Sequence, residues 1–343
     1  PDRIPHPAMN EIKHIYQNLW IEPDGNGAYR AININYFTAI DHYNYEIVSI
    51  PRKYSKGAKS SVVLRGRADV DIPANDTLTI HLPQFKMQEG YDYYVNFTGE
   101  QSWNQYPLGD CAIAQVTTTS KKAKVEFEVN AESGIIEKYR VNGVDYIADG
   151  FGLRPNYWRA PIDNDYGNGA PARWQAWKVY GKANKPAEVT DQMVGENRVV
   201  KVVYNLEELG CNNVVTYTIE PSGILTVEAQ MSEASFKEAP RYGVRWRMPQ
   251  EFSNVRFYGR GPWENYCDRK DGAVLDIYSC SVDDMYVPYV RPQENGHRVD
   301  VRWLEIKNAK GRGLTIYAVE NPFEFNALHN SVEDFDCEES DAP

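Results

Sequence analysis

The first candidate for chemistry is the stretch NYWRAPIDNDYGNG at residues 156–169. It places Arg159 close to the run Asp163-Asn164-Asp165, among aromatic, proline and glycine residues. Oxygen-bearing side chains this close could bind a cation, and paired carboxylates could transfer protons. The run lacks the D-x-N-x-D-G spacing of a calcium loop, and Asp and Asn often bond the amides of their own loop. We therefore expect no metal site in this chain and interpret the acids as a brace for the loop.

Two further segments combine Arg, Pro, Asn, acids and aromatic rings. We define the first loop as residues 154–167, the second loop as GRGPWENYCDR at 259–269, and the third loop as MYVPYVRPQENG at 285–296. Arg, Asn and Asp can bond vicinal hydroxyls while Trp or Tyr stacks on a sugar ring, although rings also cover the open end of any sandwich. The candidate residues in the second and third loops are Glu264, Asn265, Glu294 and Asn295.

Paired carboxylates in these loops could also hydrolyse a glycosidic bond, at a separation of about 5–5.5 Å for retention or about 6.5–9.5 Å for inversion. The candidates are Asp163 with Asp165, Glu264 with Asp268, and Glu294. The chain holds 48 acidic residues, however, so some clustering is unavoidable. Solvated or loop-bonding acids are the simpler interpretation.

Other reaction classes lack their residue patterns. There is no G-x-S-x-G elbow and no H-x-x-x-H or C-x-x-C spacing, and Pro262 removes an N–H that a phosphate loop would use. Five dispersed cysteines argue against a disulfide framework or a zinc site. His297 near Glu294 is the one pair that could epimerise a sugar, but a surface histidine in a loop is the simpler explanation.

Charge and hydropathy limit the partners. Lys and Arg number 37 against 48 Asp and Glu, a formal net charge of −11 with no basic run, so we expect neither nucleic-acid nor membrane binding. No window approaches the roughly 18–20 apolar residues of a membrane-spanning helix. The N-terminal PDRIPHPAMNEIK has no apolar core, so we expect no signal peptide in this sequence; cytoplasmic and periplasmic locations both stay open.

The elements that position these loops are predicted to be strands, because apolar and polar residues alternate along most of the chain. In residues 1–115 the alternation covers 28–37, 43–50, 61–65, 77–82 and 91–97. Short strands at this spacing are typical of an immunoglobulin-like sandwich, which we place at residues 1–115.

Residues 116–343 continue the alternation. Strands are predicted at 124–129, 135–141, 144–147, 198–204, 214–219, 224–229 and 313–319. Asn142-Gly143 predicts a hairpin turn, and residues 170–180 are the best helix candidate. We therefore predict an all-β chain whose second domain, residues 116–343, is a large antiparallel β-sandwich of about 12–18 strands.

In its three loops the sequence resembles the C-terminal part of the large β-galactosidases of glycoside hydrolase family 2. The order RPNYWRAPIDNDYG, GRGPWENYCDR, MYVPYVRPQENG is similar to the signature of that family's last domain, the small-chain β-sandwich. Upstream, PHPAMNEIKHIYQNLWIE is similar to the segment that leaves the catalytic barrel and enters the fourth, immunoglobulin-like domain. The resemblance covers nearly all of the chain.

This resemblance implies a galactose-mutarotase-like super-sandwich after the immunoglobulin-like domain. It also implies a parent enzyme that cleaves terminal β-D-galactosides with retention through a covalent glycosyl-enzyme. The family's catalytic acid/base and nucleophile lie in an N-terminal TIM barrel, and its G-G-D-x-S-W segment has no counterpart before the sequence stops at DFDCEESDAP. The resemblance therefore assigns no catalytic residue to this chain, which we expect to be inactive alone.

For cofactors and partners, the resemblance implies Mg²⁺ and possibly Na⁺ in the parent enzyme and none in this chain. Arg291 stands where the sodium-type loop commonly has an apolar residue. The implied partners are a β-galactoside or lactose-type sugar, the rest of the same polypeptide, and further copies in a homo-oligomer. The chain would support the active-site wall and subunit contacts.

Two other functions are alternatives: an independent galactoside-binding module that uses the three loops, and a mutarotase-like sugar epimerase. Because the sequence stops before the family's final segment, we also expect a large sandwich that is truncated at its C-terminal end. Such a sandwich would self-associate through an unpaired edge.

Overall fold

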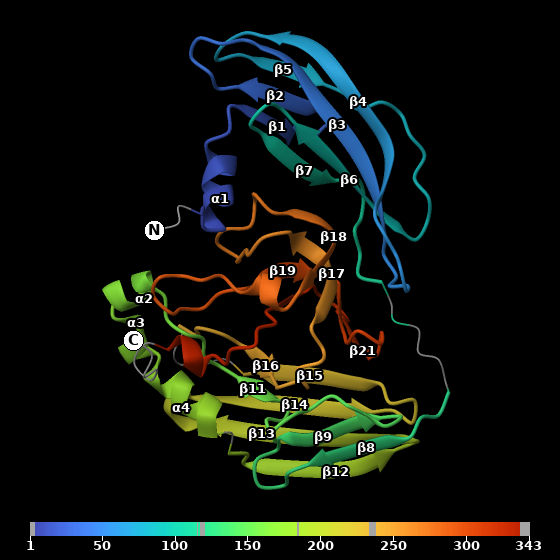
Figure 1. Ribbon diagram of the computed structural model, residues 1–343, viewed down its shortest axis with the longest axis vertical. Helices are drawn as coiled ribbons and strands as arrows, with labels where there is room; N and C mark the ends of the chain where they lie inside the picture. The colour runs from blue at the N-terminus through green and yellow to red at the C-terminus, as the bar shows by residue number, and fades with distance from the viewer. Residues whose placement is uncertain (1–3, 115, 117–120, 184, 233–237, 337–343) are drawn as a thin grey trace.

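The computed structural model describes residues 4–114, 116, 121–183, 185–232 and 238–336. In this part of the chain the strands form seven sheets, and every pairing between them is antiparallel. A smaller sandwich occupies one end of the elongated molecule, and a larger group of sheets occupies the other end (Figure 1). The predicted all-β class is confirmed.

The smaller sandwich contains a three-stranded sheet, β1-β2-β5, and a four-stranded sheet, β4-β3-β6-β7. Its strands are β1 (Leu19–Pro23), β2 (Tyr29–Asn33), β3 (Ile40–Pro51), β4 (Ser61–Ile72), β5 (Thr77–Ile80), β6 (Tyr91–Thr98) and β7 (Trp103–Pro107). Alternate residues point into one shared core, as Tyr93, Val95 and Phe97 of β6 show. This period of two is the pattern that made these strands predictable.

The larger group comprises fifteen described strands, within the predicted range. They are β8 (Val125–Val129), β9 (Ile136–Val141), β10 (Val144–Asp145), β11 (Arg154–Asn156), β12 (Glu188–Val194), β13 (Asn197–Leu206), β14 (Cys211–Ile219), β15 (Leu225–Met231), β16 (Gly243–Arg245), β17 (Asn254–Gly261), β18 (Val274–Ser281), β19 (Arg298–Val301), β20 (Trp303–Lys307), β21 (Gly313–Tyr317) and β22 (Phe323–Phe325). The sheet orders are β12-β13-β14-β15, β18-β17-β20-β21, β10-β9-β8, β11-β16 and β19-β22.

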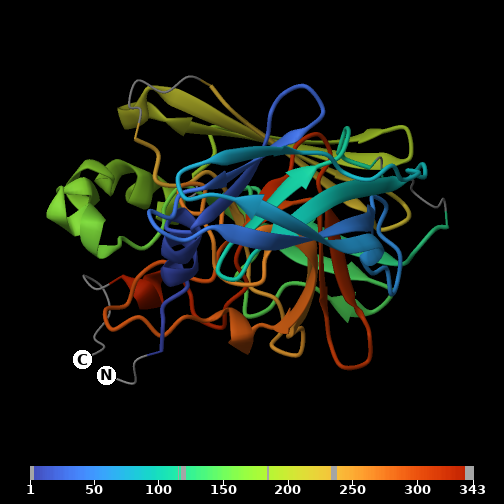
Figure 2. The same ribbon diagram turned by 90° about the horizontal axis from the view of Figure 1, so that it is seen from above.

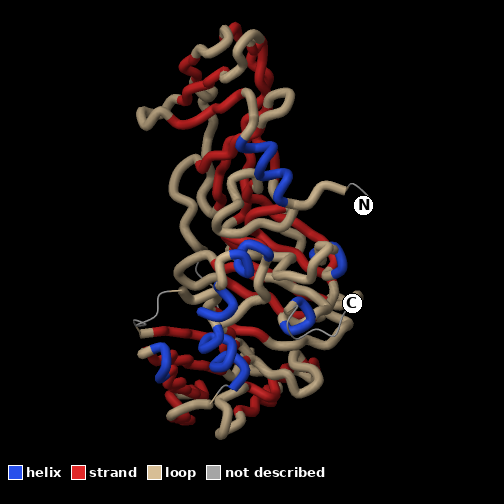
Figure 3. The backbone as a smooth tube through the Cα atoms, turned by 90° about the vertical axis from the view of Figure 1, so that its left-hand side faces the viewer, coloured by secondary structure: helices blue, strands red, loops and turns tan. Residues whose placement is uncertain are grey.

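Four short α-helices lie on one side of the molecule, the side that faces the viewer in Figure 3. They are α1 (Ala8–Ile15), α2 (Asp163–Gly167), α3 (Ala170–Arg173) and α4 (Gln175–Ala183). The helix predicted at 170–180 is confirmed as α3 and α4, which stand out from the sheets when the molecule is seen from above (Figure 2). The short 3₁₀ helices are η1 (Glu207–Leu209), η2 (Asp283–Met285) and η3 (Glu333–Phe335).

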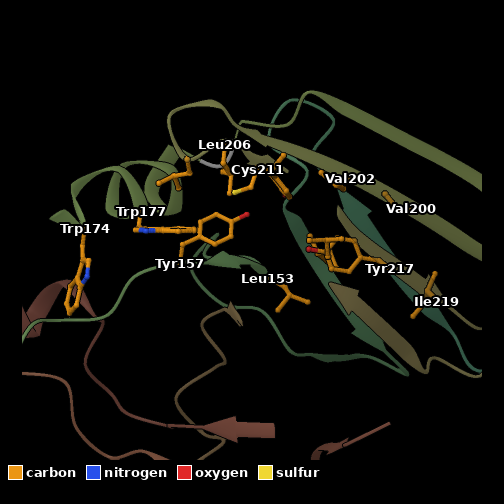
Figure 4. Close-up of a cluster of buried hydrophobic side chains, with 14 of the residues drawn as sticks. Leu153, Tyr157, Trp174, Trp177, Val200, Val202, Leu206, Cys211, Tyr217 and Ile219 are labelled. Carbon is orange, nitrogen blue, oxygen red and sulfur yellow. The ribbon is translucent and has the colours of Figure 1, made fainter. Parts of the chain in front are cut away.

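Helices α3 and α4 lie at one end of the β12–β15 sheet (Figure 1). Trp177 is fully buried, and its ring lies 6.2 Å from that of Tyr157, which follows β11. Both rings pack with alternate residues of β13 and β14, such as Val202 and Tyr217, in one apolar cluster (Figure 4). The Tyr157 hydroxyl also accepts a hydrogen bond of 2.6 Å from Asn213 Nδ2. The chain that leads into the first loop is therefore anchored on the sheet.

The two groups of sheets share a small buried core. Val48, Ile50 and Tyr94 from β3 and β6 pack against residues of β17, β18 and β20, which are Tyr258, Leu275 and Trp303. Inside this core the Tyr258 hydroxyl donates to Asp92 at 2.7 Å and lies 3.2 Å from the Tyr94 hydroxyl. A shared core with satisfied polar groups favours one fixed arrangement of the two groups. The predicted boundary between residues 115 and 116 stays a prediction.

Helix α1 adds a second contact between the two groups. The Glu11 carboxylate accepts a hydrogen bond of 2.7 Å from the backbone N–H of Gly272, and the Trp103 indole donates to the Gly272 carbonyl at 2.8 Å. A Cβ on Gly272 would come within 3.0 Å of a Glu11 carboxylate oxygen. Glycine at this position therefore allows the close approach of α1.

Helix η3, near the end of the described chain, is held by ion pairs. Glu333 forms a two-bond pair with Arg245 of β16, at 2.8 and 3.0 Å. Asp336 pairs at 2.5 Å with Lys178 of α4, which lies 4.7 Å from the Trp158 ring. Burial raises the pKa of Glu333, but the bonds and charge of Arg245 outweigh it and hold that pKa below its usual value.

We predict that Tyr258→Phe lowers the free energy of unfolding by about 1–3 kcal/mol, because it removes a buried donor from Asp92 while keeping the ring. Urea denaturation followed by tryptophan fluorescence measures this change. Tyr36→Phe is the matched control, since that side chain is 78% exposed and its loss of a hydroxyl should change little. Equal midpoints for both variants and the unmodified chain would show that the shared core does not depend on this hydrogen bond.

The Glu333–Arg245 pair predicts a pH dependence. A carboxyl whose pKa is lower in the folded state adds stability that is present above its unfolded pKa, about 4.3, and lost as the pH falls through the folded value. The stability difference between the unmodified chain and Glu333→Gln should therefore be largest near pH 6 and shrink towards pH 3. Thermal unfolding of both proteins across this range tests it, and a constant difference would contradict it.

Candidate functional site

The first loop is organised by Asp165. Its carboxylate accepts two hydrogen bonds from the Arg159 guanidinium, at 2.7 and 3.2 Å, and one of 2.8 Å from the N–H of Ile162. Ile162 precedes α2, so Asp165 caps the start of this helix by reaching back from its third residue. Arg159 in turn lies 4.9 Å from the ring of Trp174 in the core. The segment predicted to be a loop is thus partly helical, and its buried acid forms the helix start.

The other acid of this run faces outward. The Asp163 side chain is 70% exposed and pairs with Arg291 of the third loop at 3.0 Å. Arg291 also lies 4.0 Å from the Tyr166 ring of α2, while Asn164 is exposed. The first and third loops are therefore neighbours at the surface, connected by the arginine that departs from the sodium-type pattern.

Glu264 holds the second and third loops together. Its side chain is completely buried and accepts three hydrogen bonds of 2.7 Å, from Arg269, the Tyr289 hydroxyl and the N–H of Gly296. Gly296 has a φ of +78°, and a Cβ there would approach Leu328 and the Met285 carbonyl oxygen to 2.9 Å. The glycine of the Glu294-Asn295-Gly296 motif therefore allows its N–H to reach the carboxylate.

Glu294 points to a different set of partners. One of its oxygens accepts hydrogen bonds from Arg241, at 2.6 Å, and from Asn326, at 3.1 Å. The glutamate is 3% exposed and the arginine side chain 16% exposed. Burial lowers the pKa of Arg241, but the charge and hydrogen bond of Glu294 outweigh it and leave that pKa raised.

Asn265 and Asn295 shape the backbone of their loops. Asn265 donates to the carbonyls of Arg260 and Trp263, at 3.0 and 2.9 Å, and accepts from the N–H of Val299. Asn295 donates to the Gln293 carbonyl and accepts from the N–H of Val287. Both amides are buried, so these bonds satisfy backbone groups that water cannot reach.

Tyr266 and His297 form a stacked pair between these carboxylates. The rings lie 4.8 Å apart at 16°, and the Arg269 guanidinium lies 4.6 Å from the tyrosine ring. Burial raises the pKa of the Tyr266 hydroxyl. His297 is 6% exposed and lies 2.8 Å from Glu324, whereas Glu294 bonds Arg241. The expectation of a surface histidine is wrong, and the two groups suggested for epimerase chemistry bond other partners.

Several residues that complete this cluster were missed by the sequence analysis. Arg241, Glu324 and Asn326 lie outside the three loops, and their spacing in the chain carries no signal of a shared site. Tyr289 and Arg269 lie inside the motifs but were not singled out. They are brought together because β19 pairs with β22 and runs beside β17.

Comparison with known proteins identifies the family. A profile described as the β-galactosidase small chain matches residues 121–341, well over half of the chain. The chain belongs to this β-galactosidase family. The resemblance seen in the sequence is therefore confirmed, as is the large β-sandwich that it implied.

Relatives in this family are longer proteins. A β-galactosidase from Priestia megaterium is 28% identical over 359 residues, covering 95% of this chain and 34% of the relative. One from Streptococcus thermophilus is 28% identical, covering 99% of this chain and 36% of the relative, and one from Psychromonas ingrahamii is 32% identical, covering 88% and 33%. The chain thus spans about one third of the length of the β-galactosidases that it matches.

Within the described ranges, the candidate residues of this family member form no metal-ligand group and do not line either of two hollows. Two hollows among the described residues, of about 60 and about 420 Å³, are lined entirely by other side chains. Over the same ranges, no group of three or more His, Cys, Asp or Glu could hold a metal ion, and no helix is long and apolar enough to cross a membrane. Asp163 and Asp165, the acids of the suggested cation loop, both bond arginines. These residues therefore do not fit a bound Mg²⁺.

We predict that Glu264→Gln lowers the free energy of unfolding by about 3 kcal/mol, the cost of removing one charge from a buried pair. Thermal or urea unfolding measures it. Asp163→Asn is the matched control, because its ion pair is exposed and should contribute less than about 1 kcal/mol. A similar small loss in both variants would mean that Glu264 does not hold the two loops together.

Proposed function

We propose that this chain is a non-catalytic part of a β-galactosidase that hydrolyses terminal β-D-galactosides with retention. Family membership and relatives named as β-galactosidases support the parent activity. Because the chain matches about one third of those relatives, the remaining two thirds of such a protein can supply the catalytic residues.

The observation that carries the proposal is the engagement of the carboxylates in the three loops. Retaining hydrolysis requires one carboxyl group that gives a proton to the leaving oxygen and another that attacks the sugar. Asp165, Glu264 and Glu294 are buried, and each accepts hydrogen bonds from two or more internal donors. A carboxylate that is buried and bonded to fixed internal donors lacks the access to substrate that either role requires.

The strand arrangement also supports the proposal that the catalytic residues lie outside this chain. A TIM barrel is built from eight parallel strands, whereas all described pairings here are antiparallel. We therefore assign the two catalytic glutamates, and any Mg²⁺ or Na⁺ of the enzyme, to the rest of the polypeptide. The galactoside would bind there as well.

We assign this chain a supporting role in the intact enzyme. The exposed residues of the first and third loops include Asp163, Asn164, Val290 and Arg291, and an ion pair joins the two loops. Beneath them, Glu264 and Glu294 fix the backbone through buried hydrogen bonds. A rigid, polar and partly apolar surface of this kind suits one wall of a sugar pocket and contacts with further subunits of a homo-oligomer.

We predict that the purified chain does not hydrolyse a chromogenic β-galactoside above the buffer rate, even at high protein concentration with Mg²⁺ present. The reason is that each carboxylate pair suggested by the three loops contains a buried acid with internal hydrogen bonds. A full-length β-galactosidase from Priestia megaterium, assayed in parallel, controls for substrate and conditions.

Three outcomes distinguish the proposed function from its alternatives. If the chain neither hydrolyses the substrate nor binds lactose in isothermal titration calorimetry, the result favours a supporting role without a sugar site of its own. Saturable lactose binding without turnover would replace the proposal by an independent galactoside-binding module. Turnover that disappears in Asp163→Ala or Glu294→Ala, and survives repurification, would mean that the loops contain their own active site.

A further inference from the structure

Strand β4 (Ser61–Ile72) is a long edge strand with one open side. It has 12 residues, about twice the usual strand length, and within the described ranges its backbone pairs only with β3. Helix α1 packs at β7, the other edge of the same sheet, so β4 runs along the opposite side of the smaller sandwich (Figure 1). The backbone N–H and C=O groups on the open side of β4 can therefore pair with a further strand.

The exposed face of β4 carries charges in a mirrored order. Four alternate residues are charged, two basic and then two acidic: Arg65, Arg67, Asp69 and Asp71. The side chains of Arg67 and Asp69 are 56% and 83% exposed, and they pair with each other at 3.0 Å. Arg65 pairs with Glu46 of β3 at 3.3 Å. Ion pairs this exposed contribute little to the stability of one chain, so these charges can also be used by a partner.

A second copy of β4 that runs antiparallel matches this order charge for charge. If the two strands cross at Ala68, Arg67 of one copy lies opposite Asp69 of the other. Two residues further out, Arg65 lies opposite Asp71. A two-fold axis repeats both contacts, so this register forms only pairs of opposite charge. A shift of the crossing point by one residue would place Arg67 opposite Arg67 or Asp69 opposite Asp69, and like charges directly opposite each other destabilise a sheet.

The same register also extends the apolar face of the sheet. On the side of the sandwich core, Leu64 comes opposite Ile72 of the second copy, and Ala68 comes opposite Ala68. All three side chains belong to the apolar cluster of the smaller sandwich or pack against it. A register in which charged residues lay opposite apolar ones would turn the apolar face of the second copy towards solvent. The register that matches the charges is therefore also one that keeps the apolar residues on one face.

We propose that two copies of this chain pair through their β4 strands, antiparallel about Ala68, and form one continuous sheet across a two-fold axis. Each copy contributes the sheet β4-β3-β6-β7. A contact of this kind uses the same surface on both copies, so it closes at two copies and does not propagate. The proposal depends on β4 alone and not on the proposed function, which the hydrolysis assay tests separately.

Other features of β4 distinguish it from a protected edge. Edge strands are commonly protected by lysine, proline or charges that point into the sheet, and β4 contains none of these, because its four charged residues are all exposed. Its register with β3 is regular from Leu64 to Asp69, the segment that contains the central charge pair. Strand β12, also at the edge of its sheet, carries Glu188 and Asp191 and no basic residue, so two copies of it would repel each other.

The first test is sedimentation velocity of the 343-residue chain over a range of protein concentrations. We expect an equilibrium between monomer and dimer that shifts towards the monomer as sodium chloride is added, because salt screens exposed ion pairs. A single monomeric species at every concentration would overturn the proposal.

Charge reversals test whether β4 is the contact. Arg67→Asp should weaken the dimer at least about ten-fold, because it places acids opposite each other at both positions related by the two-fold axis, and Asp69→Arg should do the same with basic residues. Lys122→Asp is the matched control, since it makes the same change of net charge as Arg67→Asp in an exposed ion pair outside β4. Equal weakening by all three variants, or none by the two β4 variants, would overturn the assignment to β4.

A mixture of the two β4 variants tests the register. At positions 67 and 69 the Arg67→Asp chain holds two acids and the Asp69→Arg chain two basic residues, so each should be monomeric alone while the mixture forms a heterodimer. A double variant that combines Arg67→Asp with Asp69→Arg should form the homodimer again. If neither the mixture nor the double variant associates, the proposed register is wrong.

Hydrogen exchange of the unmodified chain covers the case in which a variant does not fold. Amides of β4 should exchange more slowly at high than at low protein concentration, because the second copy accepts or covers them, whereas amides of β12 should exchange equally at both. Equal exchange of β4 at concentrations where the chain is dimeric and monomeric would place the contact elsewhere and overturn the proposal.

Discussion

A carboxylate can be buried only if donors replace the water that it loses, and this constraint organises the loops of this protein. Glu264 meets it with three donors from three places: Arg269 in its own loop, Tyr289 in the middle of the third loop and the N–H of Gly296 at its end. All three donors must reach the Glu264 carboxylate at the same time, so this one buried charge constrains the backbone of the second and third loops. Gly296 can serve because its backbone adopts a positive φ where a side chain would clash.

The same principle repeats around this centre. Asp165 with Arg159 starts helix α2. Glu294 ties the third loop to Arg241, which precedes β16, and to Asn326, which follows β22. The Tyr266 ring stacks with His297 and also contacts the Arg269 guanidinium, so cation and ring contacts add to the ion pairs. The result is a connected polar network in which the removal of one member leaves another buried group unpaired. Networks of this kind favour a single loop conformation, and this rigidity is one basis of the supporting role that we propose.

The junction between the two groups of sheets uses a different balance of forces. Apolar side chains such as Ile50 and Leu275 provide most of the contact, and the hydroxyls of Tyr94 and Tyr258 satisfy one buried carboxylate, Asp92. Helix α1 reinforces the junction through Glu11 and Gly272. The outward loops therefore rest on a base that includes both groups. A base of this size would help to keep the shape of a pocket wall, the role that we propose for these loops.

The sequence by itself determined the class of the fold. In a strand with one buried face, apolar and polar residues alternate with a period of two, so Tyr93, Val95 and Phe97 predict β6. In the same way, Asn142-Gly143 predicts the turn between β9 and β10. Strand β20 was missed because both of its faces are buried, which removes the alternation. In β17 the alternation is interrupted in the middle, where Phe257, Tyr258 and Gly259 are all buried. Short elements such as α2 were missed because their start depends on a side chain that reaches back from within the helix.

For the site, the sequence indicated which three loops to consider and predicted that their acidic side chains form internal hydrogen bonds. It did not indicate which residues donate these hydrogen bonds. Glu264 and Glu294 lie in motifs that can be read directly, whereas Arg241, Glu324 and Asn326 have no local signature. Only the tertiary structure decided these pairings, because burial and hydrogen bonding depend on which segments meet in space. Local sequence determines how a segment prefers to fold; the packing of distant strands determines which charges lose their water and which donors replace it.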